Sequence, residues 1–244
     1  MKSWLCFLVP AVLLAADPEA VERLFDGKLT ALQRATACLE LRGKADPEVI
    51  NALSRAMEDP DLLSCAADNL QRIGAIEPLK HALGSESFQV RAAAARELGT
   101  LQRPELLEVL GRAAQDENML VAINALAGLT QYQGAAVVPY LTALARKGGI
   151  TGDMALDRLW QLDPDMALNI ARSLLASTQV ADLLYAMRII GASGDSSDLP
   201  QLKKIAAANP ETLTQRDRGF GFMPAINLSR AAQSAMESIQ ARSK

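Results

Sequence analysis

One stripe of small and aliphatic residues recurs along most of the chain at intervals of 28 residues. In Val90–Leu101 (VRAAAARELGTL) its members are separated by 3, 1, 3, 1 and 3 residues, which places them on one face of a helix. The stripe runs 28 residues earlier from Leu62 to Ile73, and 28 residues later from Asn118 to Leu129. Small residues in its middle allow a neighbouring helix to approach closely. The stripe therefore predicts equivalent helices that pack against one another.

A second helical segment follows each of these copies, with a proline near its start at Pro78, Pro104 or Pro139. Proline fits the first turn of a helix, where its missing N–H leaves no bond unmade. A helix pair that repeats at this period cannot bury its apolar face alone, so it must stack on its neighbours. The sequence predicts an all-α fold, an α-solenoid of about six helix pairs plus a C-terminal capping helix. The expected pairs are 30–42 with 47–57, 60–73 with 76–83, 87–101 with 104–114, 117–130 with 135–145, 153–162 with 164–176 and 179–190 with 198–208, and the capping helix is 227–241.

The segment VRAAAARELG, followed by a helix of the Pro-x-x-Leu type, resembles the HEAT repeat in its short bacterial HEAT-like form, which also occurs in phycobilin lyases (the PBS-lyase type). The resemblance extends over roughly residues 30–208 and specifies packing rather than chemistry. It implies a curved superhelix whose inner surface, formed mostly by the second helices, holds a partner protein.

The first sixteen residues differ from the rest of the chain. Lys2 gives a positive start, Trp4–Ala16 is an apolar run of 13 residues, and Ala15-Ala16 offers small residues for cleavage before Asp17. The run is too short to span a bilayer, which needs about 20 residues. We therefore predict a signal peptide at 1–16 and one solenoid domain at 17–244, exported to the periplasm or secreted. The alternative is a buried N-terminal helix.

Charge and composition exclude some classes of partner. Without residues 1–16 the chain keeps 24 Lys and Arg (25 less Lys2) against 28 Asp and Glu, a net charge of −4. This acidic balance, with a pI near 5.3, lacks the basic footprint that nucleic acid requires. Outside residues 1–16 no segment is apolar enough for stable membrane insertion.

The remaining cysteines, Cys38 and Cys65, lie on the first helices of consecutive pairs. An oxidising compartment would permit a disulfide between them. The sequence favours the alternative, two small core residues, because the cysteines do not occupy equivalent positions of the stripe.

Two insertions interrupt the 28-residue spacing. The first contains Gly148, Gly149 and Gly152, which predict a flexible or sharply turned loop. The second, about 209–224, carries Arg218, Phe220 and Phe222. Insertions in solenoids often lie on the binding face. The two phenylalanines are therefore expected to cover the open end of the last repeat, to contact a partner, or to do both.

No arrangement of residues indicates catalysis or metal binding. His81 is the only histidine, and it is expected to face solvent because it lies off the apolar stripe of its helix. The Asp-Pro-acid triplets that begin at Asp17, Asp46, Asp59 and Asp163 combine a helix N-cap with a first-turn proline, and predict helix starts rather than metal ligands. We therefore expect no metal, no cofactor and no enzymatic activity.

The sequence as a whole predicts a non-enzymatic protein–protein interaction module or scaffold whose partner is a protein or peptide. The alternatives are a structural or assembly protein that self-associates and an enzyme similar to the phycobilin lyases. Polar residues off the stripe of the second helices, together with the second insertion, are the expected partner-binding positions. They are Lys80, Arg112, Lys203, Arg218, Phe220 and Phe222.

Overall fold

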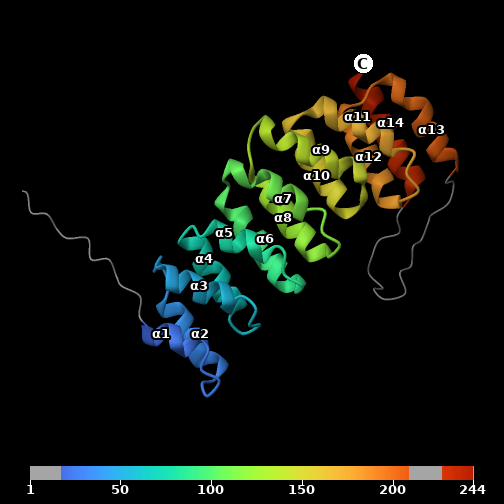
Figure 1. Ribbon diagram of the computed structural model, residues 1–244. Helices are drawn as coiled ribbons and strands as arrows, with labels where there is room; N and C mark the ends of the chain where they lie inside the picture. The colour runs from blue at the N-terminus through green and yellow to red at the C-terminus, as the bar shows by residue number, and fades with distance from the viewer. Residues whose placement is uncertain (1–17, 209–226, 244) are drawn as a thin grey trace, which may run out of the picture. The chain divides into compact units, whose positions relative to one another are not determined.

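The computed structural model describes residues 18–208 and 227–243, and all regular elements in these ranges are helices (Figure 1). The all-α prediction is confirmed, and the fold is an α-solenoid. Residues 1–17, which contain the predicted signal peptide, lie outside the described residues. The chain divides into two compact units, Met1–Leu101 and Gln102–Lys244.

The first unit contains stacked helix pairs. A capping box opens its second helix, where Gln33 N donates to Thr30 Oγ1 (3.3 Å) and Thr30 N donates to Gln33 Oε1 (2.9 Å). The first helices α2, α4 and α6 contact one another in succession, and the second helices α3 and α5 lie beside them. The bounds are α1 (Pro18–Leu24), α2 (Ala31–Glu40), α3 (Pro47–Ala56), α4 (Leu63–Arg72), α5 (Ile76–Ala82) and α6 (Phe88–Leu101).

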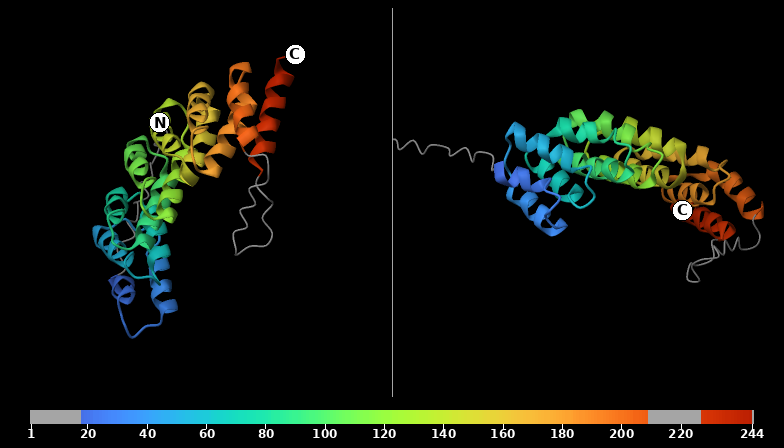
Figure 2. Two further views of the ribbon diagram at one scale, coloured as in Figure 1. Left: turned by 90° about the vertical axis from the view of Figure 1, so that its right-hand side faces the viewer. Right: turned by 60° about the horizontal axis from the view of Figure 1, so that its bottom comes forward.

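The second unit continues the same pattern. Helix α10 packs against α8, α9, α11 and α12, and α14 packs against both α12 and α13. Figure 2 shows α14 in red beside the orange helices that precede it in the chain. The bounds are the 3-10 helix η1 (Pro104–Leu106), α7 (Leu107–Ala113), α8 (Met119–Gln131), η2 (Ala135–Val137), α9 (Val138–Lys147), α10 (Gly149–Leu162), α11 (Pro164–Leu174), α12 (Val180–Ser193), η3 (Ser196–Asp198), α13 (Leu199–Ala208) and α14 (Leu228–Arg242).

The sharp turn predicted in the glycine-rich insertion is present at its start, but the rest of the insertion is helical rather than a loop. Gly148 and Gly149 turn the chain with φ of +71°, and α10 already begins at Gly149. Gly152 is buried inside α10, where a Cβ would lie 3.0 Å from the carbonyl oxygen of Leu144 in α9. This glycine is needed because two helices approach closely, and the sequence pattern does not distinguish that need from flexibility.

Asp59 does not start a helix as the sequence predicts. The chain turns through this region, and α4 begins only at Leu63. The Asp59 carboxylate pairs with Arg34, whose guanidinium also donates to Asp61 Oδ2 at 2.9 Å. The hydrogen bond from Arg34 lowers the pKa of Asp59. The other carboxylate oxygen, Asp59 Oδ1, accepts from Asp61 N at 2.9 Å within this turn, whereas Asp163 caps α11 by accepting from Met166 N (3.0 Å).

The packing stripe yields a stability prediction at Ala94, which has no exposed surface. Ala94→Leu adds three carbon atoms to a closed helix interface, so we expect it to lower the free energy of unfolding by about 1–3 kcal/mol. Chemical denaturation measures the change, with Gln89→Leu on the exposed side of α6 as the matched control. Equal stability of the two variants would contradict the assignment of the stripe.

Candidate interaction groove

A groove of about 620 Å³ crosses the first helices of the first unit. Helix α4 supplies four of its nine lining residues, the end of α2 and the residues after it supply one rim, and α6 supplies the other. Charged side chains dominate its lining, unlike the apolar stripe that holds the same helices together. The lining residues are Leu39, Arg42, Asp61, Ser64, Cys65, Asp68, Arg72, Arg96 and Glu97.

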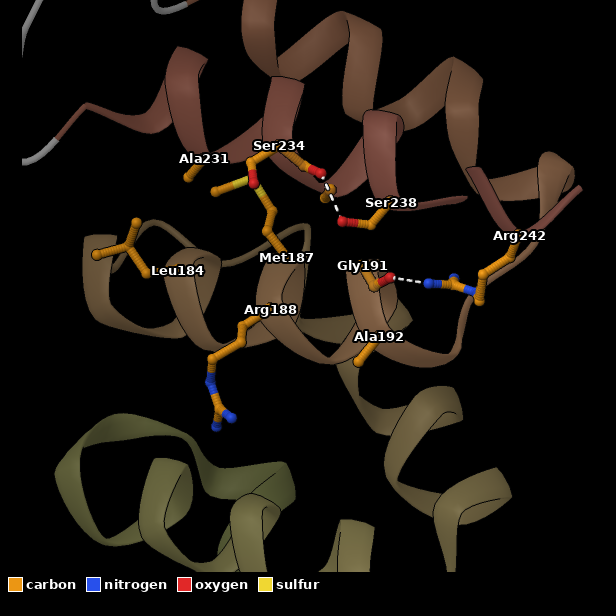
Figure 3. Close-up of a pocket in the computed structure, with 10 residues that line it drawn as sticks. Leu184, Met187, Arg188, Gly191, Ala192, Ala231, Ser234, Ser238 and Arg242 are labelled. Carbon is orange, nitrogen blue, oxygen red and sulfur yellow. Dashed lines mark hydrogen bonds between the residues drawn. The ribbon is translucent and has the colours of Figure 1, made fainter. Parts of the chain in front are cut away.

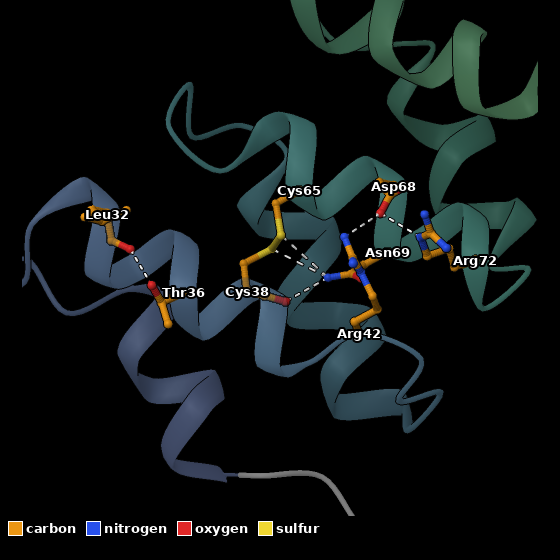
Figure 4. The surroundings of a disulfide bond; sticks show 8 residues. All are labelled: Leu32, Thr36, Cys38, Arg42, Cys65, Asp68, Asn69 and Arg72. Carbon is orange, nitrogen blue, oxygen red and sulfur yellow. Dashed lines mark hydrogen bonds and ion pairs between the residues drawn. A yellow bond between two sulfur atoms is a disulfide. The ribbon is translucent and has the colours of Figure 1, made fainter.

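Ion pairs fix the charged side chains of the groove. Asp68 Oδ2 accepts from Arg72 Nε at 2.8 Å and from Arg42 Nη2 at 3.3 Å, as Figure 4 shows. The hydrogen bond and the charge of Asp68 raise the pKa of Arg72. On α6, Glu97 Oε1 accepts from Arg96 Nη2 at 2.7 Å. A guanidinium has five N–H donors, so each of these half-exposed arginines can keep its ion pair and also bind a carboxylate of a partner.

A disulfide joins Cys38 of α2 to Cys65 of α4, with the two Cα atoms 6.4 Å apart. The preference for two separate core cysteines is therefore wrong. Neighbouring first helices lie close enough that side chains at unequal heights of the stripe still meet. Asn69, which is fully buried, donates from Nδ2 to the carbonyl oxygen of Cys38 at 2.8 Å, and no described residue is a partner for its Oδ1. The bond and the asparagine link consecutive repeats beside the groove (Figure 4).

The partner-binding residues predicted on second helices lie in both units. Lys80 of α5 pairs with Glu77 Oε1 at 2.9 Å, and Arg112 of α7 pairs with Glu108 Oε1 at 3.5 Å. Lys203 is exposed on α13. No described contact brings these three residues together, and the predicted Arg218, Phe220 and Phe222 lie outside the described residues.

Sequence reasoning missed the charged residues of the first helices. A usable signal was present, because Asp68 and Arg72 are four residues apart on one helix face, and Arg96 follows Asp68 by the 28-residue period of the repeat. Which acid pairs with which arginine depends on how far neighbouring helices are shifted along their axes. The sequence of one helix does not determine that shift.

A second depression, of about 410 Å³, lies between α12 and α14 (Figure 3). Gly191 belongs to its wall, in the last turn of α12. A Cβ at Gly191 would lie 3.1 Å from Ala235 Cα, so the two helices approach too closely for a larger residue. Arg242 donates to the carbonyl oxygens of Gly191 and, at 2.9 Å, Gly194. This depression therefore belongs to the joint that holds α14 on α12.

Two buried carboxylates lie at the contact of α10 with α12. Asp182 accepts from Gly149 N at 2.8 Å and from Ser177 Oγ at 2.6 Å, and so caps the start of α10 from another helix. Asp153 is 2% exposed, and its Oδ1 has no partner among the described residues. Burial, followed by the charge of Asp182, raises the pKa of Asp153 to about 6, and Arg188 opposes that rise.

This carboxylate makes the stability of the second unit depend on pH. The pKa of Asp153 is about 6 in the fold and 3.8 in the unfolded chain, so stability falls as pH rises between these values and stays low above them. We expect Asp153→Asn to raise the free energy of unfolding by roughly 1–3 kcal/mol at pH 7 and by little at pH 4. Denaturation across this pH range measures the difference, with the exposed Glu237→Gln as control. A pH-independent effect would contradict the burial of a charged Asp153.

Within residues 18–208 and 227–243, no group of three or more His, Cys, Asp or Glu side chains could hold a metal ion. In the same ranges no helix combines the length and the apolar character needed to cross a bilayer. His81 is exposed on α5, as its position off the stripe predicts.

These features define a helical-repeat protein with a charged groove across its first helices. Residues 76–149 match the family model of HEAT repeats, which confirms the resemblance read from the sequence. No curated protein matches the chain.

Solved structures with a similar course of the chain include human deoxyhypusine hydroxylase in complex with glycerol. It is 18% identical, the match covers 92% of this chain and 96% of that one, and the TM-score is 0.38. A designed armadillo repeat protein is 15% identical over 91% of this chain and 99% of its own, with a TM-score of 0.37. These likenesses have no bearing on activity.

Proposed function

We propose that this chain is a non-enzymatic module that holds a protein partner in the groove across α2, α4 and α6. The observation that carries the proposal is the set of half-exposed arginines, Arg42, Arg72 and Arg96, each held by an acid on the groove wall. Arginine is enriched at interfaces because its planar fork binds carboxylates with defined geometry. Because the ion pairs hold these side chains in place, less side-chain freedom is lost on binding.

The match to HEAT repeats supports a protein as the partner, since repeats of this kind generally mediate protein–protein contacts. The partner would present carboxylates to the arginines and basic or polar groups to Asp61 and Asp68. Charge pairs at an interface mainly determine which partner binds and how fast it associates. We therefore expect binding that weakens as the salt concentration rises.

We also propose that the protein is exported to the periplasm or secreted, after removal of residues 1–16. The Cys38–Cys65 disulfide supports this location, because structural disulfides form and persist in oxidising compartments. The apolar run Trp4–Ala16 supports it independently. N-terminal sequencing of the protein recovered from the exported fraction tests the proposal, and a chain retained in the cytoplasm with Met1 intact would contradict it.

Partner capture from the exported fraction tests the binding proposal. The groove variant is Arg42→Glu/Arg72→Glu/Arg96→Glu, and the matched control is Lys80→Glu/Arg112→Glu/Lys203→Glu, which makes the same change of charge on second helices. After chemical cross-linking we expect the wild type and the control to retain the same partner and the groove variant to lose it. Loss from the control alone would contradict the proposed site and favour the second helices. Retention of the partner by both variants would contradict binding at either surface. Circular dichroism checks that both variants remain folded.

Self-association is a second candidate function, favoured by exposed leucines on α2. Leu32 is 77% exposed and Leu39 is 50% exposed, and they lie seven residues apart on one side of the helix. Exposed apolar surface of this kind often marks an interface. Sedimentation velocity of the wild type and of Leu32→Glu/Leu39→Glu tests this candidate, and a wild type that is monomeric at high concentration would contradict it.

A further inference from the structure

We propose that the Cys38–Cys65 disulfide is a thiol–disulfide exchange site, at which the thiolate of a small acidic peptide attacks Cys65 from the groove. The two cysteines of the disulfide differ in solvent exposure. Cys65 is half-buried and lines the groove, whereas Cys38 has no exposed surface. We therefore expect the incoming thiolate to attack Cys65, so that Cys38 becomes the leaving group. This inference does not depend on a protein partner.

The groove offers hydrogen-bond donors to the carboxylates of a small peptide. Its volume is about 620 Å³ and it is open to solvent, so a small peptide can enter it. Arg42 and Arg72 line the groove with Cys65, and the acids of the lining balance the charge of its arginines. Carboxylates of the peptide would therefore be bound by the remaining N–H groups of these two guanidinium groups. A peptide that carries a thiol and one or more carboxylates would thus be held beside the sulfur that it attacks.

The exchange step balances without a further reactant. The attacking sulfur forms a bond to Cys65 Sγ, the bond between the two protein sulfurs breaks, and its electron pair stays on Cys38 Sγ as a thiolate. The product is a mixed disulfide between the peptide and Cys65. A second peptide thiolate can then attack the peptide's sulfur in this mixed disulfide, which releases the oxidised peptide and leaves Cys65 as a thiolate that takes up a proton.

Asn69 is placed to stabilise the leaving thiolate. Its Nδ2 lies 3.6 Å from Cys38 Sγ and 3.7 Å from Cys65 Sγ, and the bond to the Cys38 carbonyl oxygen holds it there. An N–H donor beside sulfur favours the charged form, and a thiol with a lower pKa leaves faster. The amide of a fully buried asparagine is also held in place before the reaction begins.

Other contacts keep α2 on α4 when the disulfide opens. Asn69 of α4 still donates to the Cys38 carbonyl oxygen of α2. Two ion pairs, Arg42 with Asp68 and Arg34 with Asp61, also still connect the α2 repeat to the α4 repeat. Exchange therefore does not require unfolding, and it should proceed in the native protein.

Reaction of the full chain with reduced glutathione, the probe for an acidic peptide thiol, tests the site. Cys6→Ser removes the only other cysteine. After an acid quench and alkylation of free thiols, mass spectrometry locates the adducts. We expect glutathione on Cys65 and the alkyl group on Cys38, at a rate that low denaturant concentrations do not change. Equal labelling of both cysteines, or a rate that follows global unfolding, would overturn the proposal.

Variants of the groove test whether the rate of exchange depends on the access of glutathione to Cys65 or on the stability of the protein. Ser64→Trp narrows the exposed lining beside Cys65, and Asn51→Trp is the control on the exposed side of α3. We expect glutathione exchange to slow on the order of tenfold in Ser64→Trp and to stay unchanged in the control. Arg72→Glu, with Arg112→Glu as its control, should slow glutathione more than the uncharged thiol 2-mercaptoethanol. Unchanged exchange in both Ser64→Trp and Arg72→Glu would contradict the role of the groove.

Discussion

Replacement of both disulfide cysteines, Cys38→Ala/Cys65→Ala, is expected to lower the free energy of unfolding of the first unit by about 3 kcal/mol. The bond closes a loop between residues 27 positions apart, and its loss gives the unfolded chain the freedom that this loop restricts. Alanine is the substitute because the stripe already places Ala37 and Ala66 beside these positions, so a small side chain fits the packing.

Urea denaturation with and without a reductant measures this effect. The wild type should lose about 3 kcal/mol on reduction, and the double alanine variant should not respond to the reductant. A variant as stable as the oxidised wild type would contradict the structural role of the bond. Near-equal losses by reduction and by substitution would show that the cysteine side chains contribute little beyond the bond itself.

Loss of Arg172 is expected to have an effect of similar size in the second unit. Arg172 of α11 binds Asp198 through two hydrogen bonds, Nε to Oδ1 at 2.8 Å and Nη2 to Oδ2 at 3.0 Å, and also reaches Asp195 Oδ2 at 3.1 Å. Asp198 is only 6% exposed. Arg172→Met leaves that carboxylate without its cation, and we expect a loss of about 3 kcal/mol, the lower end for a broken buried pair because Arg172 itself is partly solvated.

A double-substitution cycle separates the pair from the packing. Asp198→Asn removes the charge that Arg172→Met leaves unpaired, so the double variant should be more stable than Arg172→Met alone. Thermal or chemical unfolding of the four proteins gives the coupling energy. Additive losses would indicate that Arg172 acts through its aliphatic stem, in contradiction to the ion pair.

The sequence predicts the fold well because the need to bury one apolar helix face recurs along the chain. A stripe such as Val90–Leu101 must be buried, and its recurrence every 28 residues leaves stacked helix pairs as the solution. Helix starts with a local cause, such as the cap of α11 by Asp163, are also predicted correctly. Each of these features depends on residues a few positions apart.

Features that depend on contact between repeats could not be predicted in the same way. Asp59 resembles Asp163 in its local sequence, but its carboxylate holds a turn through Asp61 N and pairs with an arginine 25 residues earlier. Gly152 resembles a loop glycine, but the close approach of a neighbouring helix requires it. The disulfide and the charged groove likewise depend on the height of α4 relative to α2 and α6. The periodic pattern predicts that these helices are neighbours but does not give their relative height.

The central claim is that a protein partner binds across the first helices of the first unit. Amide hydrogen exchange of the protein, alone and with the partner recovered by cross-linking, tests it most directly. The account predicts slower exchange on binding in α4, at the end of α2 and in the middle of α6, with little change in α5, α7 and α13. Protection confined to those second helices, or to the segment with Arg218, Phe220 and Phe222, would contradict it.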